Sequence, residues 1–187
     1  ITIAAVGGVS RKALTAIIGT TSGVLIAGLI ALAVGSAARL TGFGTEEAAM
    51  LLYIPQEIQF DFRRLLFSGM IIGALGAVMD VAMSVASSME EVTLARPRIT
   101  QGQLLQSGLR VGRDVMGTMS NTLILAYTGG AIPLLLLFMA YGTPMIQMVN
   151  FDHIATEVVK AFAGSIGLIA AIPITAITGS RLLKPSE

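Results

Sequence analysis

Four long apolar runs, separated by polar connectors, leave this chain very few possible folds. A hydrocarbon core about 30 Å thick takes about 20 helical residues to cross. Runs of that kind lie near residues 13–38, 65–89, 113–141 and 157–179. Because every backbone polar group must be satisfied inside lipid, runs of this length predict transmembrane helices. The sequence therefore predicts an all-α fold, a polytopic transmembrane helix bundle.

The composition supports a membrane protein and argues against several other classes. Charged residues make up 12% of the chain, against roughly 25% in soluble domains, and they gather between the apolar runs. The net charge of +1 gives no reason to expect nucleic acid as a partner, and there is no Cys to serve as a nucleophile or thiolate ligand. No phosphate-binding loop, dinucleotide fingerprint, zinc-protease motif or nucleophile elbow occurs. We expect no enzymatic activity, no cofactor and no bound metal.

The charges in the connectors predict how the spans are oriented. Residues 1–10 read as the tail of a preceding span, and residues 11–187 as the membrane domain of a longer chain. Thr45 is a candidate cap for a short amphipathic helix over residues 45–53. Eight Lys and Arg residues fall on the side that holds residues 11–12, 96–113 and 181–184, and four fall on the other. The positive-inside rule therefore predicts that this first side, with the C-terminus, is cytoplasmic.

Asp80 is the residue in the spans that most invites a function. It is the only ionisable side chain between Leu65 and Met89. An Asp at a helix centre costs about 2.5 to 3.5 kcal/mol to insert, so such residues face a bundle interior or a water-filled cavity. We therefore expect Asp80 to be buried inside the bundle, either as a proton carrier or as an acid that hydrogen-bonds two helices together.

Polar residues in two spans are the expected partners of Asp80. Ser84 lies one turn beyond it. In the third run, Asp114, Thr118 and Asn121 share one helical face at spacings of three and four, which predicts a polar track from the cytoplasmic side inward. Asn121 and Thr122 are the predicted neighbours of Asp80. The alternative is ordinary helix-to-helix hydrogen bonding, without a role in transport.

Glycines in two of the spans predict close packing and a bend. Gly69, Gly73 and Gly76 form a smooth stripe on the second span, against which a neighbouring helix can rest. In the third span, the segment from Gly129 to Pro133 frees backbone carbonyls at mid-membrane and predicts a kink or discontinuity.

Two segments of the sequence resemble a known family. The segments from Gly73 to Ser84 and from Gly112 to Gly129 resemble the YibE/F family of bacterial membrane proteins, and the resemblance spans most of residues 13–180. It implies a multi-pass protein of the bacterial cytoplasmic membrane. Members usually carry an extra N-terminal extracytoplasmic region and earlier spans, which fits a start within a span here.

A more distant similarity is to the membrane half of SecD and SecF, and through them to the resistance-nodulation-division transporters. There, a glycine-rich helix carries an Asp that serves proton-driven work, and the next helix carries a polar segment. Asp80 matches the first element, and Ser120, Asn121 and Thr122 loosely match the second. The flanking SecD signatures are absent. The similarity implies one half of a transporter-type membrane fold.

These observations lead to one main hypothesis and two alternatives. The main hypothesis is a proton-coupled transporter or export accessory protein in which Asp80 carries the coupling H⁺. One alternative is a non-transporting membrane scaffold that binds a partner, and the other is an ion channel lined by the bend in the third span. Four spans are few for a complete transporter, so we expect a second copy or a paired membrane subunit to supply a facing half.

Overall fold

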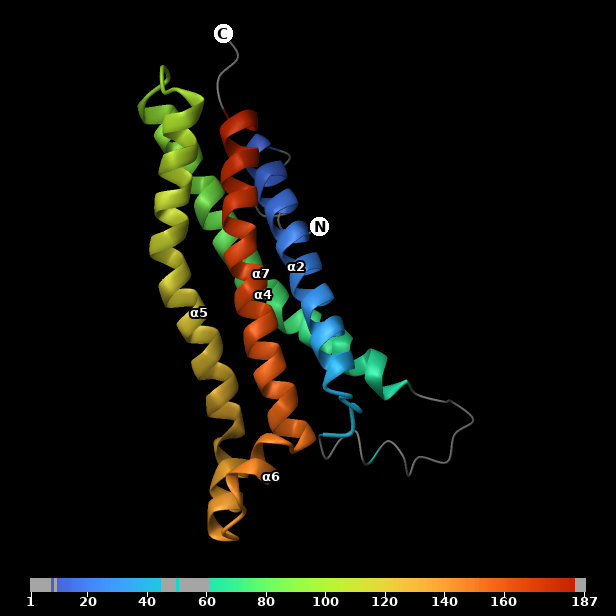
Figure 1. Ribbon diagram of the computed structural model, residues 1–187. Coiled ribbons are helices and arrows are strands. Elements are labelled where there is room, and N and C mark those ends of the chain that lie inside the picture. Colours follow the sequence, from blue (N-terminus) through green and yellow to red (C-terminus); the bar gives the residue numbers. More distant parts are fainter. Residues whose placement is uncertain (1–7, 9, 45–49, 51–60, 184–187) are drawn as a thin grey trace.

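The protein is a bundle of long helices. The computed structural model describes residues 8, 10–44, 50 and 61–183, and every regular element in this part is a helix. The predicted span tail at 1–10 and amphipathic helix at 45–53 lie almost wholly outside the described residues. The all-α prediction is confirmed, because four of the helices are long and apolar enough to cross a membrane. These are α2 (Arg11–Ala37), α4 (Phe62–Ala95), α5 (Gln101–Ala140) and α7 (Asp152–Leu182), and α6 (Met145–Val149) is a short helix between α5 and α7 (Figure 1).

Side chains cap the first turns of α2, α4 and α5, and each of these helices begins before its apolar run. Ser10 accepts a hydrogen bond from the Ala13 amide at 3.1 Å. Thr100 and Gln103 form a reciprocal capping box at the start of α5. The polar segment from Glu90 to Gly112, predicted as a connector, is therefore mostly helical and leaves only a tight turn over residues 96–100.

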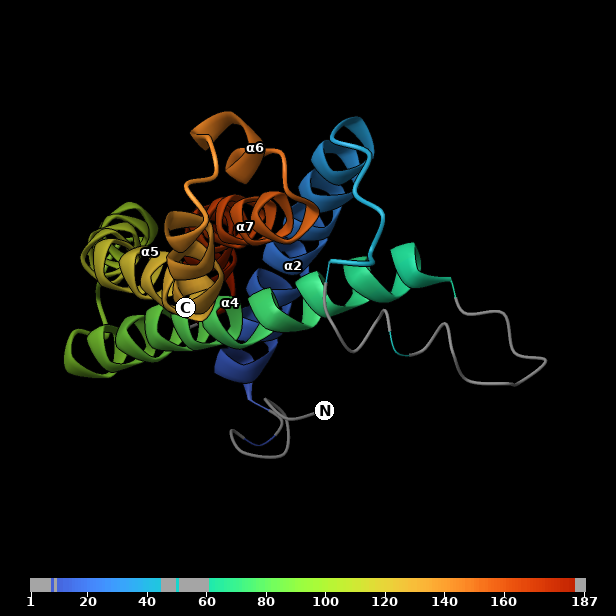
Figure 2. The ribbon, with the colours of Figure 1, turned by 90° about the horizontal axis from the view of Figure 1, so that it is seen from below.

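Helix α7 lies at the centre of the bundle and packs against α2, α4 and α5. Helix α4 is inclined to the other long helices and crosses them (Figures 1 and 2). Polar contacts join the helix ends on both sides. On one side, Lys12 of α2 pairs with Glu90 of α4 at 2.7 Å. On the other, the backbone amide and hydroxyl of Thr41 donate to the Asp152 carboxylate at 3.2 and 3.0 Å.

The main apolar core lies where α4, α5 and α7 meet. Val78, Val81 and Val85 of α4 are completely buried there, together with Leu104 of α5 and Leu168 of α7. Only 6% of the most apolar stretch of α5 is buried, against 50% in α7. Helix α5 is therefore a peripheral helix, and α7 is the one around which the bundle is built.

Two glycines allow α2 and α7 to cross with their backbones nearly in contact. A Cβ atom placed on Gly167 would lie 2.6 Å from the carbonyl oxygen of Gly23. A Cβ placed on Gly23 would lie 2.8 Å from the carbonyl oxygen of Gly167 and 2.7 Å from the Ala171 side chain. Since ordinary carbon–oxygen contacts are longer, only glycine fits at either position.

We therefore expect Gly23→Ala to destabilise the bundle by about 1 to 3 kcal/mol, the usual cost of an added methyl in a tight core. The matched control is Gly129→Ala in α5, where an added Cβ meets nothing within 4 Å and the helix gains propensity. Thermal unfolding of the purified protein in detergent, followed by circular dichroism, measures both. A Gly23→Ala variant as stable as the native chain would show that the two backbones do not approach this closely.

Candidate functional site

Asp80 lies on the outer surface of the bundle, and the prediction that it is buried was wrong. Its side chain is exposed, although its position in the sequence places it well inside the apolar part of α4. Among the described residues, it makes no hydrogen bond or ion pair with any other side chain. The acid therefore points away from the helices that the sequence was expected to place around it.

The direction of Asp80 follows from how α4 packs. The face of α4 that meets α7 and α5 carries Val78, Val81 and Val85, each 0% exposed. A residue on an α-helix is turned by about 100° from its neighbour, so Asp80 cannot share the face of Val78 and Val81. Small residues such as Ala74 and Ala82 provide the close packing on the inner face, where both are buried.

The glycine stripe lies on the same outer face as Asp80. Gly69, Gly73 and Gly76 are exposed, as is Ser84 one turn beyond the acid. A Cβ on Gly69 or Gly76 would meet nothing within 4 Å, and one on Gly73 would meet only the Tyr127 hydroxyl, at 3.2 Å. These glycines were expected to pack helices together, but within the described bundle no helix rests on Gly69 or Gly76. We call Gly69, Gly73, Gly76, Asp80 and Ser84 the outer face of α4.

The polar residues of α5 also face outward. Asp114, Thr118, Asn121 and Thr122 are all exposed and share one side of the helix, as the spacing predicts. The Thr122 hydroxyl donates to the carbonyl of Thr118 at 2.9 Å, so it satisfies its own helix. Among the described residues, the structure does not bring Asn121 or Thr122 into hydrogen-bond contact with Asp80.

The predicted discontinuity in α5 is not observed, and the alternative of a kink stays a prediction. The helix continues from Gln101 to Ala140 through Gly129, Gly130 and Pro133 without a discontinuity. An added Cβ at Gly129 or Gly130 would meet nothing within 4 Å, so neither glycine is required for helix packing in the described bundle.

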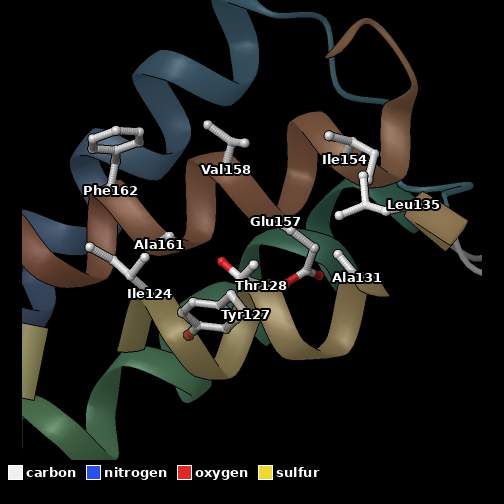
Figure 3. Close-up of a pocket in the computed structure, with 10 residues that line it drawn as sticks. All are labelled: Ile124, Tyr127, Thr128, Ala131, Leu135, Ile154, Glu157, Val158, Ala161 and Phe162. Atoms are coloured by element: carbon white, nitrogen blue, oxygen red, sulfur yellow. The ribbon is translucent and has the colours of Figure 1, made fainter. Parts of the chain in front are cut away.

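Sequence reasoning missed a cavity between α5 and α7 (Figure 3). It measures about 240 Å³ and is lined mainly by apolar side chains, with Thr128 of α5 and Glu157 of α7 projecting into the space between the helices. Lys160 binds the Glu157 carboxylate at 2.6 Å. Because Lys160 neutralises Glu157, the cavity offers an apolar surface without an unpaired charge. The only signal in the sequence was an acid and a base at a spacing of three.

His153 is part of the bundle. It lies in the first turn of α7, is partly buried, and its Nδ1 is 2.9 Å from the carbonyl oxygen of Gly44. Among the described residues, no group of three or more His, Cys, Asp or Glu side chains is placed to hold a metal ion. The contact of His153 is therefore a structural one, which fastens the segment after α2 to α7.

Four apolar helices of this length and an acid in the middle of one of them define a multi-pass helical membrane protein. The family model of the YibE/F-like protein matches residues 1–185, so the chain belongs to the YibE/F-like family. No curated protein and no solved structure matches it. Nothing in these comparisons supports the more distant similarity to SecD and SecF, which stays a prediction.

Proposed function

We propose that this chain is one half of a proton-coupled membrane transporter or export accessory protein, in which the outer face of α4 meets a second copy of the chain. Asp80 carries the proton at the interface between the two bundles. The observation that supports this proposal is the outward direction of Asp80 at the middle of an apolar helix. In this proposal, two bundles together enclose Asp80, whereas the sequence had predicted that a single bundle would bury it.

The depth of Asp80 argues that protein, and not lipid, covers it. At 1.5 Å per residue, Asp80 lies about 22 Å along α4 from Leu65 and about 14 Å from Met89. An acid facing hydrocarbon at such a depth costs about 2.5 to 3.5 kcal/mol. The glycines beside it have no side chains with which to shield it. Contact with another protein surface would remove that cost, because the partner can offer hydrogen bonds or enclose water.

A second copy suits the outer face of α4 better than an unrelated helix does. Copies inserted in the same orientation are related by a two-fold axis along the membrane normal, so residues of α4 that lie next to this axis face their own copies in the partner. Small residues at Gly69, Gly73 and Gly76 then allow two α4 helices to approach closely. The two Asp80 carboxyl groups then come near each other, which places the proposed proton carriers of both copies at one interface.

The other predicted polar residues remain candidates for the water path to this acid. Ser84 lies one turn from Asp80 toward the predicted cytoplasmic side. Asp114, Thr118 and Asn121 expose a continuous polar surface on α5. Water that reaches Asp80 from the cytoplasm needs hydroxyl and amide groups of this kind along its route.

We expect Asp80→Asn to abolish proton flux, because an amide side chain cannot take up and release a proton as a carboxyl group does. The measurement is proton flux through the full-length protein in liposomes under an imposed pH gradient. Glu91→Gln is the matched control, since it removes an exposed acid from the end of the same helix. Equal flux in the native and Asp80→Asn proteins would remove Asp80 from the proton path. No flux in either protein, with equal thermal stability of the two, would favour the non-transporting membrane scaffold.

The interface has its own test, because the chain has no cysteine. A single Gly76→Cys variant should form a disulfide-linked dimer in membranes on mild oxidation. The matched control, Val78→Cys, lies two residues away but is 0% exposed and should stay monomeric. If Gly76→Cys reacts with a membrane-permeant maleimide yet never cross-links, the outer face of α4 meets lipid or another protein, and the second copy is excluded there.

We further propose that the protein lies in the bacterial cytoplasmic membrane with its C-terminus in the cytoplasm. Arg11, Glu90 and Leu182 lie at the same end of the bundle, where the Arg11 guanidinium reaches the Leu182 carbonyl at 3.5 Å and Lys12 pairs with Glu90. That end holds most of the basic residues and should face the cytoplasm. A C-terminal alkaline phosphatase fusion is expected to be inactive and a C-terminal fluorescent protein fusion to be bright. The opposite pair of results would invert the orientation.

A further inference from the structure

Two adjoining hollows lie at the turn between α4 and α5. One has a volume of about 410 Å³ and lies between the end of α4 and the first turns of α5. The other has a volume of about 450 Å³ and lies against the turn itself. Arg96, Ile99 and Gln103 line both. The hollows therefore form one continuous concave surface at the end of the bundle that we place in the cytoplasm.

This surface is strongly basic. Arg96, the C-cap residue of α4, and Arg110 of α5 line the first hollow. Arg98 lines the second, and so does Arg96. Neither hollow has an acidic residue in its lining, and among the described residues none of these arginines has an ion-pair partner. Glu90, farther down α4, is already paired with Lys12 at 2.7 Å. Three arginines therefore line the two adjoining hollows, and no acidic residue lines either of them.

Neutral donors stand beside the arginines. Gln106 and Ser107 line the first hollow, and Gln103 lines both. The side-chain carbonyl oxygen of Gln103 accepts a hydrogen bond from the backbone amide of Thr100 at 3.2 Å, which orients the Gln103 side chain. Its side-chain amide nitrogen is left to donate elsewhere. Guanidinium forks together with amide and hydroxyl donors are the groups that recognise the oxygens of a phosphate.

We propose that this surface binds a phosphate group through Arg96 and Arg110, either on the headgroup of an anionic lipid or on a soluble phosphate compound. Arg96 lies about 10 Å beyond Met89 along α4, at 1.5 Å per residue. Because α4 is inclined to the other helices (Figures 1 and 2), the distance along the membrane normal is shorter than this. The headgroup layer extends roughly 5 to 7 Å beyond the hydrocarbon, so the site lies near its outer edge. A protruding lipid phosphate and a phosphate from the cytoplasm both reach it.

The test is binding of phosphatidic acid to the purified full-length protein, measured by native mass spectrometry against phosphatidylcholine of the same chain length. We expect Arg96→Gln and Arg110→Gln each to weaken binding roughly tenfold, the usual effect of losing a charge-assisted hydrogen bond. Arg113→Gln is the matched control, because Arg113 is exposed on the same helix as Arg110 but lines neither hollow. All three residues are exposed, so folding should not change, and thermal unfolding checks this.

Competition distinguishes the two sources of phosphate. If millimolar inorganic phosphate displaces phosphatidic acid, the site accepts free phosphate compounds. If it does not, while phosphatidic acid still binds through Arg96 and Arg110, the site recognises the lipid. An equal loss in Arg113→Gln would reduce the effect to general surface charge and overturn the proposal. So would native protein that binds phosphatidic acid no better than phosphatidylcholine.

Discussion

The close crossing of α2 and α7 at Gly23 and Gly167 determines much of the rest of the bundle. Because the two backbones nearly touch there, α7 lies deep in the bundle and offers its remaining sides to α4 and α5. Helix α4 must then turn Val78, Val81 and Val85 toward α7, since these side chains fill the space beside it. That rotation leaves Asp80 outside. The position of the acid is thus a consequence of packing elsewhere, and its environment depends on what covers the outer face of α4.

The sequence predicts the helices better than it predicts their rotation. Apolar length alone identifies four spans, because lipid leaves the backbone few alternatives. The direction of Asp80 was predicted wrongly because α4 has two faces that look suitable for packing. One carries Gly69, Gly73 and Gly76, and the other carries alanines and valines. In a soluble helix, polar residues would mark the outside, but a membrane helix is apolar all round and gives no such signal.

The start of α5 shows a different limit of sequence reasoning. The polar residues after Arg98 suggested a connector up to Gly112, yet α5 begins at Gln101. Thr100 and Gln103 carry the capping-box pattern, which was the signal available for a helix there. The change from polar to apolar residues marks the start of the apolar run, and it was wrongly taken as the start of the helix. The extra turns extend α5 beyond its apolar run and bring Arg110 to the same hollow as Arg96.

Helix α4 therefore joins two regions with separate physical requirements. Its middle holds Asp80, which is exposed on the outer face, and Arg96 follows its C-terminal end. Asp80 and Arg96 lie about 24 Å apart along the chain direction of α4, at 1.5 Å per residue. At that separation the two side chains do not touch, and α4 is the element that connects them. Any coupling between proton movement and phosphate binding must then act through movement of α4 itself, whose inner face is fixed against α7 by close-packed valines.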